Sequence, residues 1–137
     1  MIALVEIPIP QDIEGREQAG REVLRLLELL TDIAMRQAPT PDLYRSGVRY
    51  KGEGNGVQRF RLPYDTHAQG VGDCKQLVVW RLAELRRAGE HATPAIMWER
   101  RPGGWRAHAR VRRASGELED PSMERGMGNG RKGRRKR

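Results

Sequence analysis

The chain has 137 residues, of which 37% are hydrophobic, 5% aromatic and 32% charged, and its formal net charge is +8. This length supports one modest hydrophobic core and excludes two full domains. The single cysteine excludes an internal disulfide, and no stretch approaches the roughly 18 uninterrupted apolar residues that a membrane-spanning helix needs.

The first ten residues, MIALVEIPIP, lack the basic start and the long apolar run of a secretory signal. We therefore expect a protein of a reducing compartment, the cytoplasm of the producing cell, with no membrane partner.

The N-terminal part of the chain predicts an arm followed by a helix. Apolar residues alternate imperfectly over residues 2–9, where prolines interrupt them, so that a short edge strand or an extended arm is expected. Over residues 14–37 the apolar residues recur at helical spacing. The prolines of APTPD, residues 38–42, end this predicted helix.

The segment from residue 43 to residue 69 carries weak signals. GVRY (47–50) and VQRFRLP (57–63) could form short strands on either side of the glycine-rich KGEGNG. YDTHAQG (64–70) is predicted to be a loop. Irregular segments of this length in small domains are often functional.

The second half of the chain predicts a helix and then a small sheet. Apolar spacing indicates a helix over residues 74–87, with Asp73 as its N-cap and Gly89 after its end. Three strand-like segments follow, separated by the turns PGG and SG, and predict a three-stranded antiparallel meander. These segments are TPAIMWERR, WRAHARVRR and ELEDPS. After Pro121 glycine and arginine dominate, and we expect ordered structure to end there.

Cys74 stands at the start of the second helix, in the stretch QGVGDCKQL. The helix macrodipole and unpaired amide groups at such a position stabilise a thiolate, the nucleophilic form of cysteine. Cys74 also lies on the apolar stripe of the helix, so a role as a small core residue is the alternative. A nucleophilic thiol further needs a base within hydrogen-bond reach and a group that orients the base.

Three histidines are candidates for that base. His67 lies in the predicted loop before Cys74, and His91 follows the helix, about 20 Å away along its axis. His108 lies in the middle of a predicted strand and points away from the apolar face of that strand. The turn after this strand brings Asp120 near His108 on the neighbouring strand, which makes Cys74, His108 and Asp120 a candidate triad.

The order of these motifs resembles a known family. GDC opening a helix, AHA on a strand and LEDPS on the next strand resemble the transglutaminase-like branch of the papain-like cysteine protease superfamily, above all its small bacteriophage-encoded members. The resemblance covers about residues 70–127. It implies an α+β fold in which a cysteine-bearing helix packs on a small antiparallel sheet, forming a papain-like or transglutaminase-like core, with an additional N-terminal helix.

The domain organisation expected from this resemblance is simple. Residues 1–127 form a single transglutaminase-like domain, with the arm and first helix in residues 1–42 and the motif-bearing core in residues 70–127. Residues 128–137 form a basic flexible tail.

The resemblance implies that Cys74 is the nucleophile, His108 the base and Asp120 the residue that orients it. The backbone amide of Cys74 and a second donor would stabilise the oxyanion; Gln69 is the candidate, because a glutamine precedes the cysteine in papain-like enzymes. The implied activity is that of a phage-encoded thiol hydrolase or acyltransferase without a cofactor, acting on a peptide or protein amide through an acyl-thioester. Arginines crowd the strand after His108, where relatives usually carry apolar or acidic residues.

A second class of function fits the same sequence. A virion or assembly protein could keep this fold without catalysis and contact other phage structural proteins. We expect the protein in the host cytoplasm and, in this second case, also in the virion. The spacing of the histidines and the lone cysteine does not suit a zinc centre, so we expect no metal.

Two other features allow alternative interpretations. Trp98 and Trp105 flank the ERRPGG turn and could pack across the strands or form a substrate-binding wall. Asp73 is interpreted as a helix cap rather than a catalytic acid.

The end of the chain carries most of the positive charge. Six cations lie in it, which leaves a formal charge of +2 for the rest of the protein. They could simply solubilise the chain or contact the phosphates of DNA, and the lack of interleaved aromatic residues argues against base stacking. These candidate nucleic-acid-binding residues are Arg131, Lys132, Arg134, Arg135, Lys136 and Arg137.

Overall fold

A computed structural model of the chain describes residues 2–5, 13–52, 58–102 and 104–128. The six cations of the predicted tail, in residues 131–137, lie outside the described residues. Within the described part, no helix combines the length and the apolar character that crossing a membrane would require.

Four α-helices and one 3-10 turn are present in the described residues. The long helix α1 covers Ile13–Met35 and confirms the first predicted helix. Its buried residues include Val23, Leu27, Leu30 and Ala34, which recur every three or four positions and therefore share one face. The remaining elements are η1 (Leu43–Arg45), α2 (Pro63–Gln69), α3 (Cys74–Arg87) and α4 (Pro121–Glu124).

Seven strands form three small sheets in the described residues. The first sheet is an antiparallel pair, β1 (Ile2–Val5) with β3 (Gln58–Arg61). In the second, β2 (Arg49–Tyr50) runs parallel to β4 (Val71–Gly72). The third is the predicted antiparallel meander, whose last strand has only two residues, and its members are β5 (Thr93–Arg101), β6 (Gly104–Arg112) and β7 (Leu118–Glu119). The protein is therefore an α+β fold, as the sequence predicts.

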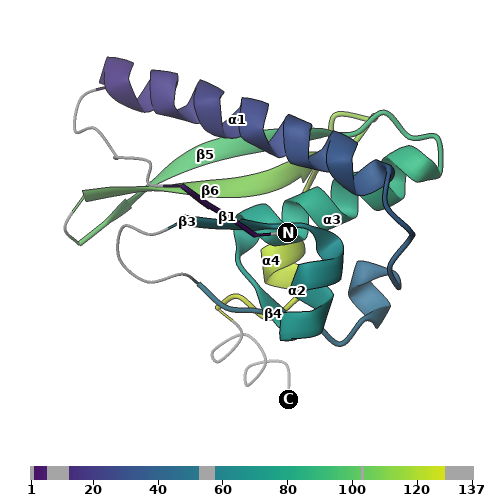
Figure 1. Ribbon diagram of the computed structural model, residues 1–137. Coiled ribbons are helices and arrows are strands. Elements are labelled where there is room, and N and C mark those ends of the chain that lie inside the picture. The colour runs from purple at the N-terminus through teal and green to yellow at the C-terminus, as the bar shows by residue number, and fades with distance from the viewer. Residues whose placement is uncertain (1, 6–12, 53–57, 103, 129–137) are drawn as a thin grey trace.

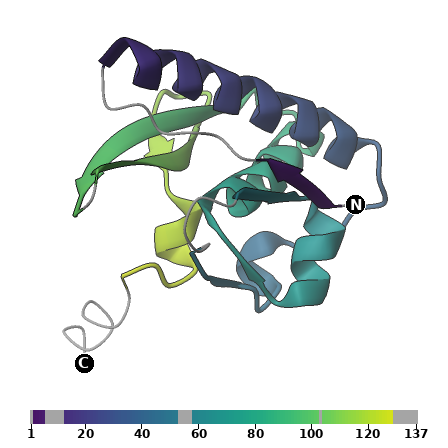
Figure 2. The ribbon, with the colours of Figure 1, turned by 60° about the vertical axis from the view of Figure 1, so that its left-hand side comes forward.

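The β5–β6 hairpin lies between α1 on one side and α4 on the other (Figures 1 and 2). The register pairs Met97 with His108 and Trp98 with Ala107, so adjacent residues of each strand face opposite helices. Trp98 belongs to the face toward α1, because its ring would lie 3.6 Å from a Cβ placed on Gly20 of that helix. His108 consequently faces the side on which α4 lies.

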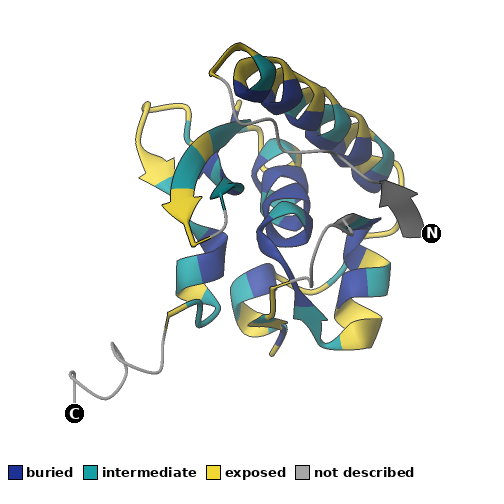
Figure 3. Cartoon of the chain, turned by 90° about the vertical axis from the view of Figure 1, so that its left-hand side faces the viewer, coloured by how far each residue is buried: buried dark blue, intermediate teal, exposed yellow. Residues whose placement is uncertain are grey.

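Helix α3 runs through the centre of the molecule and is buried on most of its sides (Figure 3). One side packs with α1 and β6 in the larger hydrophobic cluster, which contains Val23, Leu27, Val78, Leu82, Ala109 and Val111 among others. The other side packs under η1 in a smaller cluster of Leu43, Val48, Leu77 and Trp80. The sequence predicted one apolar stripe on this helix. The structure buries two of its sides, because a different layer packs against each.

The segment YDTHAQG, predicted to be a loop, forms helix α2. Pro63 occupies its first turn, where the missing amide hydrogen has no helical partner. Gly70 ends the helix in the left-handed conformation, with φ of 78°. Its backbone amide donates hydrogen bonds to the carbonyls of Thr66 and His67. A proline in the first turn and a glycine just after the end could have indicated this helix. The sequence analysis predicted a loop because the segment has no apolar stripe.

Ordered structure continues beyond Pro121, where the sequence predicted its end. Asp120 caps the short helix α4, and the Met127 amide donates a hydrogen bond to the Ser122 carbonyl at 2.8 Å. The Tyr50 amide donates to the Arg125 carbonyl at 2.9 Å. The first of these bonds closes the turn after α4, and the second attaches this segment to β2.

Candidate active site

Cys74 is the first residue of α3, and a capping box fixes the start of that helix. The Asp73 side chain accepts a hydrogen bond from the Gln76 amide at 3.1 Å, and the Gln76 side chain accepts one from the Asp73 amide at 3.2 Å. The prediction that Asp73 is the N-cap is therefore confirmed. The box places Cys74 among the amide groups that have no carbonyl partner within the helix.

Gly72 allows the chain to approach α3 closely just before Cys74. A Cβ at this position would lie 2.8 Å from Cγ2 of Thr66 and 3.2 Å from Cδ2 of Leu77. Both side chains are fully buried, so neither has room to move away. Only glycine fits here without displacing α2 or α3.

His108 and Asp120 form a direct hydrogen bond, with 2.8 Å between Nε2 and Oδ2. The other carboxylate oxygen of Asp120 accepts hydrogen bonds from the amides of Ser122 and Met123, in the first turn of α4. Both oxygens are thus engaged, and the orientation of the carboxylate is fixed. His108 is only 3% exposed.

The environment of His108 favours its protonated form. Burial lowers the pKa of the imidazole, but the hydrogen bond to Asp120 and the hydrogen bond and charge interaction with Cys74 raise it to about 9. The pKa of Asp120 is lowered: burial raises it, and the bond to His108 outweighs that effect. The two directions agree, because each describes an imidazolium beside a carboxylate.

Asp120 occupies Nε2 of His108, so Nδ1 is the remaining ring nitrogen, and the imidazole also forms a side-chain hydrogen bond with Cys74. A nitrogen in this position can accept the proton of a thiol and hold the resulting thiolate beside an imidazolium. The Cys74 side chain is itself only 7% exposed and belongs to the same buried cluster as Val78 and Ala109. The structure thus brings Cys74, His108 and Asp120 together.

A second carboxylate, which the sequence did not predict, lies near His108. Oε1 of Glu99 is 4.0 Å from Nδ1 of His108 and 3.7 Å from the Arg106 guanidinium. Glu99 and Arg106 are cross-strand partners on the face of the hairpin that carries His108. The pairing of β5 with β6 creates this contact, so no local sequence signal could have revealed it.

Tyr50 is another neighbour that the sequence did not single out. It pairs with Gly72 in the β2–β4 ladder, two residues before Cys74. Burial raises the pKa of its hydroxyl, Arg106 opposes that rise, and Cys74 and Asp73 add to it. The charge of the candidate nucleophile therefore affects the pKa of the Tyr50 hydroxyl.

Gln69, the predicted second oxyanion donor, is exposed at the end of α2. It lines a cavity of about 170 Å³ whose wall includes Gly72 and Gln76 but not Cys74. Three cationic residues, Lys51, Arg59 and Arg61, complete much of this wall. The role of Gln69 as an oxyanion donor therefore stays a prediction.

The other histidines and the tryptophans lie elsewhere. His67 packs edge-on against Trp80 with ring centroids 5.8 Å apart, and His91 is exposed after α3. The centroid of the Trp105 ring lies 4.2 Å from Cζ of Arg16, a residue of α1, and 5.4 Å from Cζ of Arg100. With Trp98 also against α1, these contacts favour packing over a substrate-binding wall.

Among the described residues, no three or more histidine, cysteine, aspartate or glutamate side chains are grouped so that they could hold a metal ion. Comparisons of the chain with protein-family models, with curated proteins and with solved structures found no match. The functional proposal therefore depends on the residues of this chain alone.

Proposed function

We propose that this protein is a transglutaminase-like thiol hydrolase or acyltransferase that cleaves a peptide or protein amide through an acyl-thioester on Cys74. The observation that carries the proposal is the 2.8 Å hydrogen bond between His108 and Asp120, formed where the imidazole also meets the cysteine at the start of α3. In this proposal α3, β6 and Asp120, the residue between β7 and α4, correspond to a papain-like core.

The proposed reaction begins with transfer of the Cys74 proton to Nδ1 of His108. The thiolate attacks the amide carbonyl carbon, and the backbone amide of Cys74 donates a hydrogen bond to the developing oxyanion. The His108 imidazolium then protonates the leaving amine, which departs as the thioester forms. Asp120 holds the imidazole in place and stabilises its positive charge throughout.

The second half of the reaction decides between hydrolysis and transfer. His108 takes a proton from water or from an acceptor amine, which attacks the thioester carbon and releases Cys74. No cofactor is required, because the chain supplies nucleophile, base and orienting acid. The motif resemblance supports a phage-encoded enzyme acting in the host cytoplasm, with no membrane partner.

The burial of Cys74 favours a second candidate function. A thiol that is 7% exposed, within an apolar cluster, is shielded from a large substrate in this conformation. Such a site would suit a virion or assembly protein that retains the fold for packing, contacts other phage structural proteins and uses its basic tail on DNA. Cys74 would then be a core residue.

An activated ester distinguishes the two functions without knowledge of the natural substrate. The protein is incubated with p-nitrophenyl acetate, and intact-mass spectrometry records acetylation of the wild type and of Cys74→Ala. We expect a burst of p-nitrophenol and an acetylated wild type, with neither in Cys74→Ala. Adding a primary amine and finding the acetylated amine as product would indicate transfer. Equal acetylation of both proteins would refute the enzymatic proposal.

A further inference from the structure

The strand that leads into Asp120 is held by very little backbone pairing. β7 consists of Leu118 and Glu119, which pair with Arg112 and Val111 of β6. Asp120 follows directly, outside the ladder. Two residue pairs at the edge of a sheet leave a chain segment free to fray. The α4 amides hold Asp120 from the residues that follow it, so on the preceding side its position depends on the side chains of β7.

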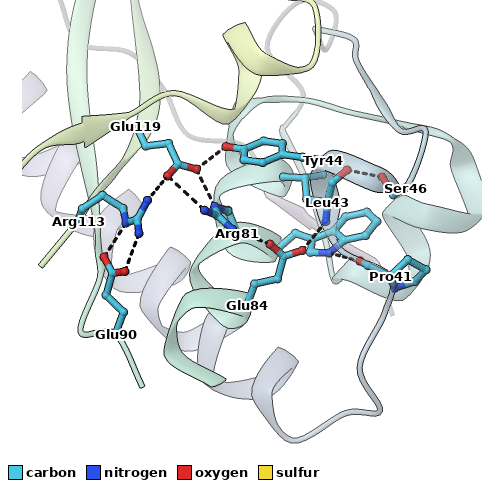
Figure 4. A network of polar contacts seen from close by, with 10 residues as sticks. Pro41, Leu43, Tyr44, Ser46, Arg81, Glu84, Glu90, Arg113 and Glu119 are labelled. Carbon is cyan, nitrogen blue, oxygen red and sulfur yellow. Dashed lines mark hydrogen bonds and ion pairs between the residues drawn. The ribbon is translucent and has the colours of Figure 1, made fainter. Parts of the chain in front are cut away.

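Glu119 supplies such contacts, and Figure 4 shows its carboxylate at the centre of a network. Arg81 of α3 donates to it through Nε at 2.6 Å and Nη2 at 3.4 Å. Arg113, just beyond β6, donates through Nη1 at 2.7 Å, and the hydroxyl of Tyr44 in η1 donates to the same carboxylate. Three segments that are distant in sequence thus converge on one side chain.

The charges around Glu119 favour its ionised state. Burial raises the pKa of the carboxyl, but the hydrogen bonds from Arg81, Tyr44 and Arg113 and the charge of Arg81 lower it overall. The Glu119 side chain is 16% exposed, so its ion pairs are less screened than those at the surface. Burial and Glu119 raise the pKa of Tyr44, which keeps its hydroxyl protonated as a donor.

The network also has outer members that do not touch Glu119. Glu90 accepts two hydrogen bonds of 2.6 Å from Arg113. Glu84 accepts one of 3.1 Å from Arg81 and another from the Leu43 amide. These outer carboxylates stabilise the two arginines without contacting the strand that carries Glu119, which makes Glu90 a natural control position.

Arg81 belongs to the same helix as Cys74, about two turns further along. The contact from Arg81 to Glu119 therefore ties β7 to the helix that carries the candidate nucleophile. Asp120 is the next residue and meets His108, which in turn meets Cys74. Successive contacts therefore connect α3 to β7, β7 through Asp120 to His108 of β6, and His108 back to α3.

We infer that Glu119 is a positioning residue of the proposed site: clamped by Arg81, Arg113 and Tyr44, it holds Asp120 in hydrogen-bonding distance of His108. This inference rests on the proposed function for its relevance to catalysis. Among the described residues, the hydrogen-bond partners of Glu119 are Tyr44, Arg81 and Arg113, and neither Cys74 nor His108 is one of them. Its effect on the thiol passes through Asp120.

The test compares Glu119→Gln with Glu90→Gln. Each change replaces one carboxylate of the network by an amide of similar shape, but only the first removes the carboxylate that β7 itself contributes to the clamp. Three readouts are taken: the NMR titration of the His108 ring, the rate of Cys74 alkylation by iodoacetamide near neutral pH, and the thermal unfolding midpoint. The third readout measures the structural cost of each variant.

We expect Glu119→Gln to shift the His108 titration toward lower pH and to slow alkylation of Cys74, because the Asp120 carboxylate is then held less closely to the imidazole. Glu90→Gln should leave both unchanged, even where it lowers the unfolding midpoint by a similar amount. A Glu119→Gln protein that melts earlier but keeps the wild-type titration and alkylation rate would overturn the inference.

A second variant covers the case in which Glu119→Gln does not fold. Tyr44→Phe removes one hydroxyl donor from the clamp and no charge, and a smaller shift in the same direction is expected; an unchanged His108 titration would overturn the inference. Failure of the proposed function is separate: the wild-type thiol would then be unreactive, while the effect of Glu119 on the His108–Asp120 bond would still appear in the titration.

Discussion

Asp120 divides its two carboxylate oxygens between His108 and helix α4. Oδ2 lies 2.8 Å from Nε2 of the imidazole, while Oδ1 accepts the amide hydrogens of Ser122 and Met123. One residue therefore caps a helix and orients the candidate base. Because the cap fixes the carboxylate, the hydrogen bond to His108 does not depend on a mobile side chain.

Asp120→Asn tests the electrostatic part of this relationship. Asparagine is a good helix N-cap, so α4 should persist, but the negative charge beside His108 is lost. We expect the pKa of His108 to fall from about 9 toward its ordinary value, and alkylation of Cys74 near neutral pH to slow. NMR titration and labelling kinetics measure both. Asp42→Asn, at an exposed position before η1, is the control and should change neither.

The same pair predicts how stability depends on pH. Folding raises the pKa of His108 from 6.5 to about 9, so this stabilisation is fully present below about pH 6.5 and is lost as pH rises through about 9. Folding lowers the pKa of Asp120 below 3.8, so its stabilisation is present above that value and is lost as pH falls below it. The contribution of the pair is therefore largest between these two ordinary values.

Urea unfolding over a series of pH values measures this contribution. The wild-type free energy of unfolding should decrease between about pH 6.5 and 9, and His108→Gln should show a smaller decrease across the same interval. An equal slope in the two proteins would mean that another group is responsible.

Two glycine substitutions should change stability in opposite directions. Gly72→Ala places a Cβ 2.8 Å from Cγ2 of buried Thr66 and should destabilise the fold by about 1–3 kcal/mol. Gly20→Ala places its Cβ 3.6 Å from Trp98, an ordinary contact, within the helix α1, and should stabilise by about 0.5–1 kcal/mol. Thermal and urea unfolding provide the values, and a shift of the same sign in both variants would contradict this packing.

The helices and the meander could be predicted where the signal is local. Periodic apolar residues indicated α1 and α3, and the acidic cap indicated the start of α3 at Cys74. Two short helices were not predicted, because α2 lacks an apolar stripe and α4 has only four residues. In both, a proline in the first turn was the usable signal.

The candidate site could be predicted in part, because motif order suggested Cys74, His108 and Asp120. The neighbours Tyr50, Glu99 and Glu119 could not, since each reaches the site through strand pairing or a long-range ion pair. Such contacts are set by register and by the packing of distant elements, which a single sequence does not specify.

The basic tail remains a prediction from the sequence. Deleting residues 131–137 removes six cations and should abolish any binding to duplex DNA while leaving folding and Cys74 labelling unchanged. If the tail contacts phosphates, log K should fall with log salt at a slope of about −0.9 per phosphate neutralised, with a limiting slope of about −5 for six cations. Titration of labelled duplexes at several salt concentrations tests this, and affinity retained by the truncated protein would place the binding surface elsewhere.

The most direct test of the central claim is the pH dependence of Cys74 alkylation by iodoacetamide in the wild type and in His108→Ala, with urea-unfolded protein as the reference. If His108 activates the thiol, the folded wild type should label faster than the unfolded reference near neutral pH, and His108→Ala should lose that advantage. Wild-type labelling no faster than the unfolded reference between about pH 5 and 9, or labelling unaffected by His108→Ala, would contradict an activated nucleophile at Cys74.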